Sequence, residues 1–271
     1  MSHHQPIDDL KTQYQNSSNL EARIALHRDF STSSTKWFDL LYNNYSVIDP
    51  NSRILELGCG SAAFWTANLH QIPTGWDVTL TDFSEGMLAD AQSNLANSSH
   101  PFTFKQVDAQ EIPFPDNSFD CVIANHMLYH VPDLDKALAE LRRVLKPDGY
   151  FFAATNGPNH LRGLKDPLEQ AAPELGEVAK KFWISSFRLD NGADLLKPYF
   201  STVELAMHDD RLRITQPQPL VDYLLSMSLD YLSEADIQRL HAIIDDRIAQ
   251  DGAIDIPKET GVFICRPQQH G

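Results

Sequence analysis

Residues 54–64 read ILELGCGSAAF, an apolar run that ends on an acid and leads into a turn with two glycines. The apolar residues predict a strand over Arg53–Leu57, and a helix over Ala62–His70 is predicted after the turn. This is the layout of a nucleotide-binding loop. A loop of the form E-x-G-x-G-x-G would have its third glycine where this chain has Ala62. The sequence therefore raises two questions, namely which ligand the loop binds and whether the loop is intact.

Strands and helices alternate downstream of the turn. A Lys-Pro-Asp-Gly stop at 146–149 separates the last predicted helix from the strand that follows it. This rhythm predicts an α/β fold with a parallel sheet and helices on both faces. The predicted strands are Val78–Thr81, Phe102–Val107, Phe119–Ala124, Tyr150–Ala154, Val203–Ala206 and Gly261–Cys265, and the predicted helices are Ser84–Leu95, Leu134–Leu145 and Asn191–Pro198.

The remaining segments are expected to cover the ligand face of this sheet. Residues 20–48 have helical periodicity that STSST at 31–35 interrupts, which predicts two helices within an N-terminal helical lid over 1–48. The domain proper is then 49–271. It carries cap insertions near 156–190, which is irregular and contains several prolines and glycines, and near 217–250, where two helices are predicted.

Composition narrows the class of protein. The net charge is −15 and the pI about 5.0, so a phosphate backbone is repelled and nucleic acid is not an expected partner. The three cysteines are an odd number in apolar or glycine-turn settings, and no Cys/His cluster has metal-ligand spacing. The N-terminus is polar and no run approaches 18 apolar residues. We expect a cytoplasmic protein without a membrane segment or a metal; the oligomeric state is left open.

Polar residues lie at the ends of four successive strands of the predicted sheet, namely Glu56, Asp82, Asp108 and the pair Asn125-His126. Carboxyl ends of parallel strands meet at one edge of a sheet, where ligands bind. The pattern Gly58-x-Gly60-x-x-Ala63 formally fits the dinucleotide fingerprint, so NAD is a rival on that motif alone. Glu56, however, would repel a diphosphate and attract an ammonium. These charges favour S-adenosylmethionine, which has a sulfonium and an amino group beside its adenosine.

Four stretches support this ligand: ILELGCG, LTDFSEGML, VDAQEIPFPDNSFDCVIANHMLYHVPD and ALAELRRVLKPDGYFFAAT. In this order they resemble the class I S-adenosylmethionine-dependent methyltransferases, and within them the methyltransferase type 11 or UbiE-like small-molecule group. The resemblance covers about residues 50–155. It implies a Rossmann-like, seven-stranded, mostly parallel sheet with an antiparallel C-terminal hairpin. The strands predicted at 203–206 and 261–265 would form that hairpin, with 217–250 inserted into it.

The resemblance also implies roles for individual residues around the cofactor. The carboxylate of Glu56 would engage the amino group, Asp82 would hold both ribose hydroxyls, and Asn125 would offer its backbone carbonyl. The other implied contacts are the backbone of Gly58, Cys59 and Gly60 at the methionine part, the side chains of Phe83 and Met87 on the adenine, and Asp108 with the Ala109 N–H at the adenine amino group. Purely structural roles stay open for two of these residues. Asp82 would equally serve as a helix cap, and Asp108 as a turn acid.

The departure from the glycine pattern at Ala62 is interpreted as a packing variation, because one added methyl is often tolerated at a small-residue contact. Outside the motif, Arg23 is a candidate partner for the methionine carboxylate, although its helix would equally pack on a sheet edge. An aromatic set could line an acceptor pocket or form ordinary cap core. Its members are Phe182, Trp183, Phe187, Tyr223 and Tyr231.

Two histidines follow the fourth strand, His126 and His130, and either could take a proton from a hydroxyl or amine acceptor. A structural role, in which His130 bonds loop backbone, is the competing interpretation. No [DNS]-P-P-[FYW] motif of amino-methylating DNA enzymes follows that strand. The predicted function is methyl transfer to a small organic molecule. The alternatives are an NAD-type oxidoreductase and a non-catalytic protein that binds S-adenosylmethionine.

Overall fold

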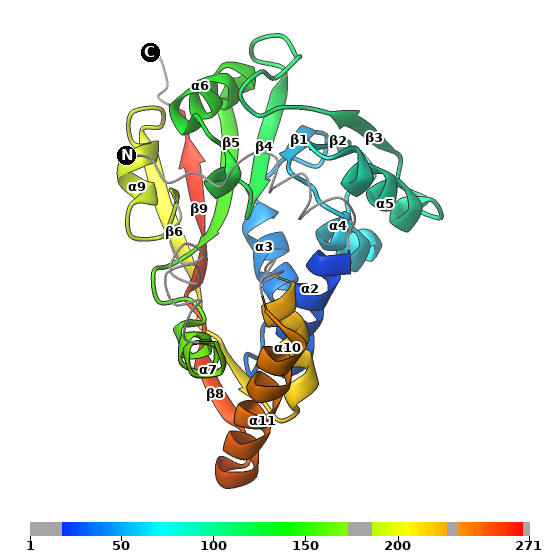
Figure 1. Cartoon of the computed structure of the whole chain (residues 1–271). Coiled ribbons are helices and arrows are strands. Elements are labelled where there is room, and N and C mark those ends of the chain that lie inside the picture. The colour runs from blue at the N-terminus through cyan, green and yellow to red at the C-terminus, as the bar shows by residue number, and fades with distance from the viewer. Residues whose placement is uncertain (1–17, 173–185, 227–231, 268–271) are drawn as a thin grey trace.

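A computed structural model describes residues 18–172, 186–226 and 232–267, and its centre is a seven-stranded sheet (Figure 1). The strand order is β3-β2-β1-β4-β5-β9-β6. Neighbours from β3 to β5 are parallel, and β9 runs antiparallel to both β5 and β6. The Rossmann-like sheet with an antiparallel C-terminal hairpin is thereby confirmed. The strands are β1 (Arg53–Leu57), β2 (Asp77–Asp82), β3 (Phe102–Gln106), β4 (Phe119–Asn125), β5 (Leu145–Asn156), β6 (Thr202–His208) and β9 (Thr260–Arg266).

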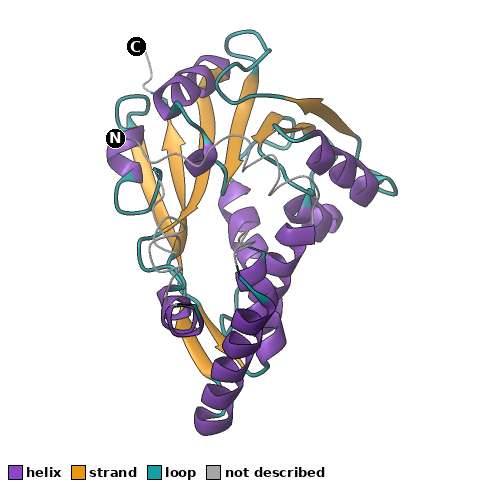
Figure 2. Cartoon of the chain, viewed as in Figure 1, coloured by secondary structure: helices purple, strands orange, loops and turns teal. Residues whose placement is uncertain are grey.

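Helices pack on both faces of this sheet, as Figure 2 shows. One face carries α6 (Leu134–Val144) and α9 (Gly192–Leu196), and the other carries α3 (Trp37–Tyr45), α4 (Ala63–Asn68) and α5 (Glu85–Leu95). The central strands β1 and β4 are buried from both sides and are accordingly mostly apolar, whereas the edge strands β3 and β6 are partly exposed. Ser84 caps the N-terminus of α5, because its hydroxyl accepts from the Met87 N–H.

Beyond the sheet, the hairpin of β6 and β9 continues as a second antiparallel ribbon, β7 (Arg211–Ile214) with β8 (Ile254–Pro257). Four helices surround it: α2 (Ser18–Phe30), α7 (Lys165–Ala171), α10 (Pro217–Leu225) and α11 (Glu234–Asp251). We call this unit, drawn below the sheet in Figure 1, the cap. It has its own apolar core, which includes Leu26, Leu168, Leu212, Leu240 and Ile256.

Several boundaries differ from the sequence prediction for local reasons. The helix predicted over Ala62–His70 ends at Asn68 and continues as a 3-10 turn, η1 (Leu69–Gln71). The strands β7 and β8 were not predicted, because four-residue alternations are weak signals. The break at 31–35 separates α2 from α3 as expected. Residues Phe182, Trp183 and Tyr231 lie outside the described residues. Phe187 belongs to the sheet core and Tyr223 to the cap core.

Candidate cofactor and acceptor site

The turn after β1 places two glycines in the left-handed region of backbone conformation, with φ +68° at Gly58 and +55° at Gly60. A Cβ on Gly58 would lie 2.6 Å from the Cβ of Met127, which follows β4. The N–H of Cys59, between the glycines, donates to the carbonyl of Thr81 at 2.8 Å. Position 58 therefore requires glycine for its conformation and for close approach of β4.

Ala62 also adopts a left-handed conformation, with φ 59° and ψ 31°, as the residue that precedes α4. Its side chain is fully buried in the sheet core. A residue with a Cβ pays about 1–2 kcal/mol in this region. A glycine at this position would thus serve the backbone conformation, and the sequence-based view of Ala62 as a packing variation omitted that strain.

Glu56 is the penultimate residue of β1 and is buried, with 3% of its surface exposed. Its carboxylate accepts from Trp65 Nε1 at 2.5 Å and from Asn125 Nδ2 at 3.2 Å, while the Oδ1 of Asn125 accepts from the Tyr45 hydroxyl at 3.0 Å. Burial raises the pKa of Glu56 to about 7, and the charge of Asp82 contributes further to the increase. Within the described part of the chain, the side-chain donors to this carboxylate are neutral and none is cationic.

Asp82 joins the end of β2 to the glycine turn. One carboxylate oxygen accepts from the Gly60 N–H and the other from the Ser84 N–H, each at 2.9 Å. Burial raises its pKa despite these bonds. Of the two predicted adenine contacts that follow, Phe83 is 45% exposed and Met87 is buried. Of these two side chains, Phe83 is therefore the one with an exposed apolar surface.

Asp108 follows β3, close to the end of β2, because the Val107 N–H donates to the carbonyl of Asp82 at 3.1 Å. Its carboxylate accepts from the backbone N–H of Gln110 at 2.8 Å and also from the side chain of Gln110. These are the contacts of a turn acid. Ala109, next to it, is buried. The structure thus places the ends of β1, β2 and β3, each with its acid, next to one another, as the sequence predicted for parallel neighbours.

The segment after β4 holds the two predicted bases. His126 has φ +56°, an uncommon conformation for a histidine, and its ring lies 5.5 Å from the ring of Trp37. The ring of His130 lies 4.5 Å from that of Tyr129. Burial lowers the pKa of His126 to about 4 and of His130 to about 3. Both imidazoles are therefore neutral at pH 7 and have a lone pair that can accept a proton.

Sequence reasoning missed His160, which follows β5. Its Nδ1 accepts from the backbone N–H of Glu259 at 3.2 Å, and burial holds its pKa well below the usual range. The neutral ring therefore carries its proton on Nε2 and is fixed as a donor at that end. Its ring lies 5.8 Å from that of His27 on α2. A lone histidine in an irregular segment carries no sequence signal that would have identified it.

The helix α2 reaches the glycine turn from the cap side. A Cβ on Gly60 would lie 3.0 Å from a side-chain methyl of Leu20. Arg23, the candidate partner of the methionine carboxylate, donates from Nε to the Ser226 hydroxyl at 3.0 Å and from a terminal nitrogen to the carbonyl of Ser226. The guanidinium is thus anchored to the end of α10, on the side of the turn that α2 covers.

The described residues contain neither a metal-binding cluster nor a membrane-spanning helix. Within 18–172, 186–226 and 232–267, no three His, Cys, Asp or Glu side chains are grouped so that they could hold a metal ion. Over the same residues no helix has the length and apolar character needed to cross a membrane.

Comparison with known sequences places a family model on the sheet. Residues 55–153 match a family described as "Methyltransferase domain". A ubiquinone/menaquinone biosynthesis C-methyltransferase UbiE from Pasteurella multocida is 32% identical over 170 residues, 56% of this chain and 61% of that protein. A demethylmenaquinone methyltransferase from Desulfitobacterium hafniense is 32% identical over 136 residues, 49% and 54% of the two chains. The chain thus spans between about half and three fifths of these curated relatives.

Solved structures with the same fold cover most of the chain. The [4+2]-cyclase SpnF superposes with a TM-score of 0.61 at 17% identity, over 98% of each chain. A phosphoethanolamine N-methyltransferase 2 from Haemonchus contortus, in complex with phosphomonomethylethanolamine and S-adenosylhomocysteine, gives 0.60 at 19% identity over 99% of this chain and 61% of that one. At such identities the likeness shows the fold alone.

Proposed function

We propose that the chain is an S-adenosylmethionine-dependent methyltransferase of the class I, UbiE-like group acting on a small organic molecule, because residues 55–153 match the methyltransferase-domain family and a UbiE enzyme is 32% identical over 170 residues. The observation that carries the proposal is the buried carboxylate of Glu56. It lies beside two left-handed glycines with only neutral hydrogen-bond donors around it. A buried carboxylate without a cation fits an ammonium ligand and disfavours a diphosphate.

The chain's own residues fit the rest of this cofactor. Asp82 already accepts from the Gly60 N–H, so a ribose bound by its carboxylate would lie directly beside the glycine turn. Phe83 offers an exposed ring for the adenine, and Asp108 follows the adjacent strand. When bound, S-adenosylmethionine supplies an electrophilic methyl group on a sulfonium. Arg23, Met87, Ala109, Cys59 and Asn125 remain proposed contacts.

On the acceptor side, His126 and His130 are proposed to take a proton from a hydroxyl or amine acceptor because both follow β4 at the ligand side of the sheet. Their lowered pKa values make both imidazoles weak bases, so this proposal rests on their position. Transfer requires the nucleophile to be held in line with the methyl group and water to be kept away. The cap helix α2 would contribute to both, because Leu20 covers the glycine turn. We further propose a cytoplasmic location and no nucleic-acid partner, on the grounds of charge and cysteine content.

Calorimetric titration with S-adenosylmethionine, S-adenosylhomocysteine and NAD tests the cofactor. We expect both sulfur ligands to bind, and Asp82→Ala to weaken binding by roughly tenfold or more through loss of charged hydrogen bonds. Asp77→Ala is the matched control, since Asp77 begins the same strand and is exposed. Binding of NAD alone would overturn the proposal. An unchanged dissociation constant for Asp82→Ala would remove Asp82 from the ribose role.

Methyl transfer itself needs a separate experiment, since a cyclase shares the fold. Release of S-adenosylhomocysteine is measured with a panel of hydroxyl, amine and carbon-nucleophile acceptors. We expect turnover with at least one acceptor class, and a slower rate for His126→Phe with the cofactor affinity unchanged. Tight cofactor binding without turnover on any class would favour the non-catalytic alternative.

A further inference from the structure

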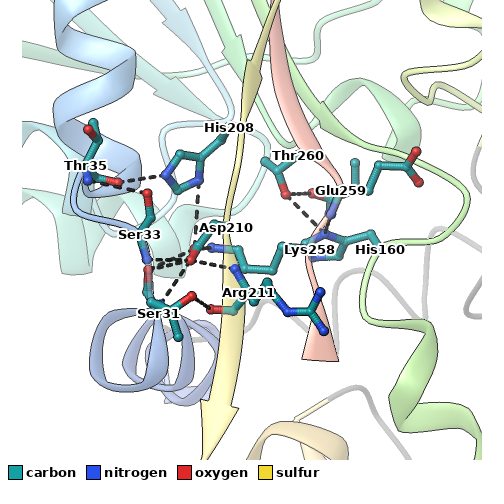
Figure 3. A network of polar contacts seen from close by, with 12 residues as sticks. Ser31, Ser33, Thr35, His160, His208, Asp210, Arg211, Lys258, Glu259 and Thr260 are labelled. Carbon is teal, nitrogen blue, oxygen red and sulfur yellow. Dashed lines mark hydrogen bonds and ion pairs between the residues drawn. The ribbon is translucent and has the colours of Figure 1, made fainter. Parts of the chain in front are cut away.

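Asp210 lies at the joint between sheet and cap, where β6 ends and β7 begins, and its side chain is fully buried (Figure 3). Its carboxylate accepts from Lys258 Nζ at 2.5 Å and from the Arg211 N–H at 2.8 Å. Its remaining donors all belong to the connection between α2 and α3. They are the Ser31 hydroxyl at 2.8 Å, the Thr32 N–H at 3.1 Å and the Ser33 N–H at 3.0 Å.

The connection at 31–35 has little besides these polar contacts to hold it. None of its five residues is buried, and all are serines or threonines, so apolar packing contributes little to its position. Three further bonds run to the same joint. The N–H and the hydroxyl of Thr32 donate to the carbonyl of Arg211 at 2.9 and 3.2 Å, and the carbonyl of Thr35 accepts from His208 Nε2 at 2.7 Å. The placement of the connection therefore depends on Asp210 and its neighbours.

Both elements that this connection joins touch the candidate site. On one side, α2 brings Leu20 against Gly60 and Arg23 to Ser226. On the other side, α3 begins with Trp37, whose ring lies 5.5 Å from His126 and also 5.5 Å from His208. A displacement of residues 31–33 would therefore move two elements of the site together: α2, whose Leu20 covers the glycine turn, and α3, whose Trp37 lies beside the proposed base His126.

We propose that Asp210 is a positioning residue for the cofactor and acceptor site: its buried carboxylate binds the backbone N–H groups at 32–33 and so fixes α2 against the glycine turn and the start of α3 beside His126. Lys258 supplies the cation that makes burial of this carboxylate tolerable. The inference rests on the proposed function only for the identity of the ligand, because the contacts from Asp210 to α2 and α3 hold whatever is bound.

The main test compares two carboxylates of the same ribbon. Asp210→Asn places an amide where N–H groups need an acceptor, whereas Asp255→Asn alters an exposed pair with Arg213. Affinity for S-adenosylhomocysteine is measured well below the unfolding temperature, with hydrogen exchange over 18–45. We expect roughly tenfold or greater weakening and faster exchange in α2 for Asp210→Asn, because small misplacements of binding groups are costly. Asp255→Asn should match the wild type.

A second pair of variants separates positioning from simple loss of stability. Asp210→Asn combined with Lys258→Met removes the unpaired buried ammonium, so unfolding stability should recover while the affinity for S-adenosylhomocysteine stays weak. Asp210→Ala leaves space for a small carboxylate, and sodium formate should restore affinity where sodium chloride of equal ionic strength does not.

The proposal is overturned if folded Asp210→Asn binds S-adenosylhomocysteine as tightly as the wild type, or if affinity recovers in step with stability in the double variant. Failure of the wild type to bind this ligand would count against the proposed function instead. Hydrogen exchange of α2 would then still decide the role of Asp210, since unchanged exchange in Asp210→Asn contradicts it without any ligand.

Discussion

Two buried carboxylates, Glu56 at the end of β1 and Asp210 at the cap joint, are equally hidden from solvent and are shifted in opposite directions. Their exposed fractions are 3% and 4%. Burial raises the pKa of Glu56 to about 7. Burial also acts to raise the pKa of Asp210, but the ammonium of Lys258 and the donors at 31–33 outweigh it and hold that pKa below its usual range. The difference lies in their partners.

This difference in partners indicates the role of each carboxylate. Asp210 finds its cation within the chain, so it serves the structure whether or not a ligand is present. Glu56 has two neutral donors, Trp65 and Asn125, which offset its burial only in part, so a cationic ligand would stabilise its charge further. A buried acid that lacks an internal cation therefore marks the ligand position better than the glycine pattern does.

The largest expected effect comes from removing the cation beside Asp210, which leaves its carboxylate buried without a cationic partner, like that of Glu56. Lys258→Met removes the cation from a fully buried pair and should cost about 3–5 kcal/mol of unfolding free energy, measured by urea denaturation at pH 7.5. The pKa of Asp210 should then rise above its unfolded value. The loss should accordingly be smaller at pH 4.5, where a raised pKa lets the folded state take up a proton.

The exposed pair of Arg213 with Asp255 on the same ribbon is the control. Arg213→Met should cost below about 1 kcal/mol, as is usual for exposed ion pairs. Equal losses for Lys258→Met and Arg213→Met would show that Asp210 does not depend on its cation, and the contrast with Glu56 would fail.

Glu56 could be found from the sequence and Asp210 could not, for a physical reason. Glu56 lies in a strand–turn–helix unit whose signals are local, and one of its partners, Trp65, is nine residues away. Asp210 meets Ser31, Thr32 and Ser33 across 177–179 residues. An acid after a short strand has no periodic or motif signature, so only the folded chain shows what it binds.

The same distinction holds for the larger elements. The five parallel strands and their acids follow from apolar runs and turns, and the family resemblance supplied the order of the C-terminal hairpin. The cap ribbon of β7 and β8 was missed because each strand has four residues and is stabilised by helices from four separate segments. The conformations of Ala62 and His126 were missed because residue type alone does not predict a positive φ outside glycine.

The raised pKa of Glu56 should make ligand binding depend on pH. If Glu56 binds the amino group of the ligand, it must be ionised, so binding of S-adenosylhomocysteine should tighten as the pH rises from 5.5 to 7. The change should approach about tenfold per pH unit below the pKa, with release of a fraction of a proton measured by calorimetry in buffers of different ionisation enthalpy. Asp210 should contribute nothing in this range, because it is already ionised.

Two controls sharpen this test. The ligand 5′-methylthioadenosine lacks the amino acid part and should bind with little pH dependence over the same interval. Glu56→Gln should flatten the profile for S-adenosylhomocysteine. A profile equally steep for Glu56→Gln would assign the proton to another group, and the proposed pairing of Glu56 with an ammonium would be wrong.

The smallest expected effect concerns the backbone beside Glu56. Ala62 and His126, at the ligand side of the sheet, have positive φ, as do Asn117 and Leu161 elsewhere in the chain. None of the donors to Asp210 has a positive φ. Ala62→Gly would relieve about 1–2 kcal/mol of conformational strain. The substitution would also cost about 0.8 kcal/mol because a buried methyl is removed. It would cost a similar amount because glycine gives the unfolded chain greater conformational freedom.

The net change for Ala62→Gly should therefore lie within about 1 kcal/mol of zero by urea denaturation. Ala91→Gly is the matched control, since Ala91 is equally buried in the same core but lies inside α5. It should cost about 2 kcal/mol, from helix propensity and the lost methyl together. Equal costs at the two positions would mean that Ala62 carries no strain, and the ligand side would then be no more strained than the joint around Asp210.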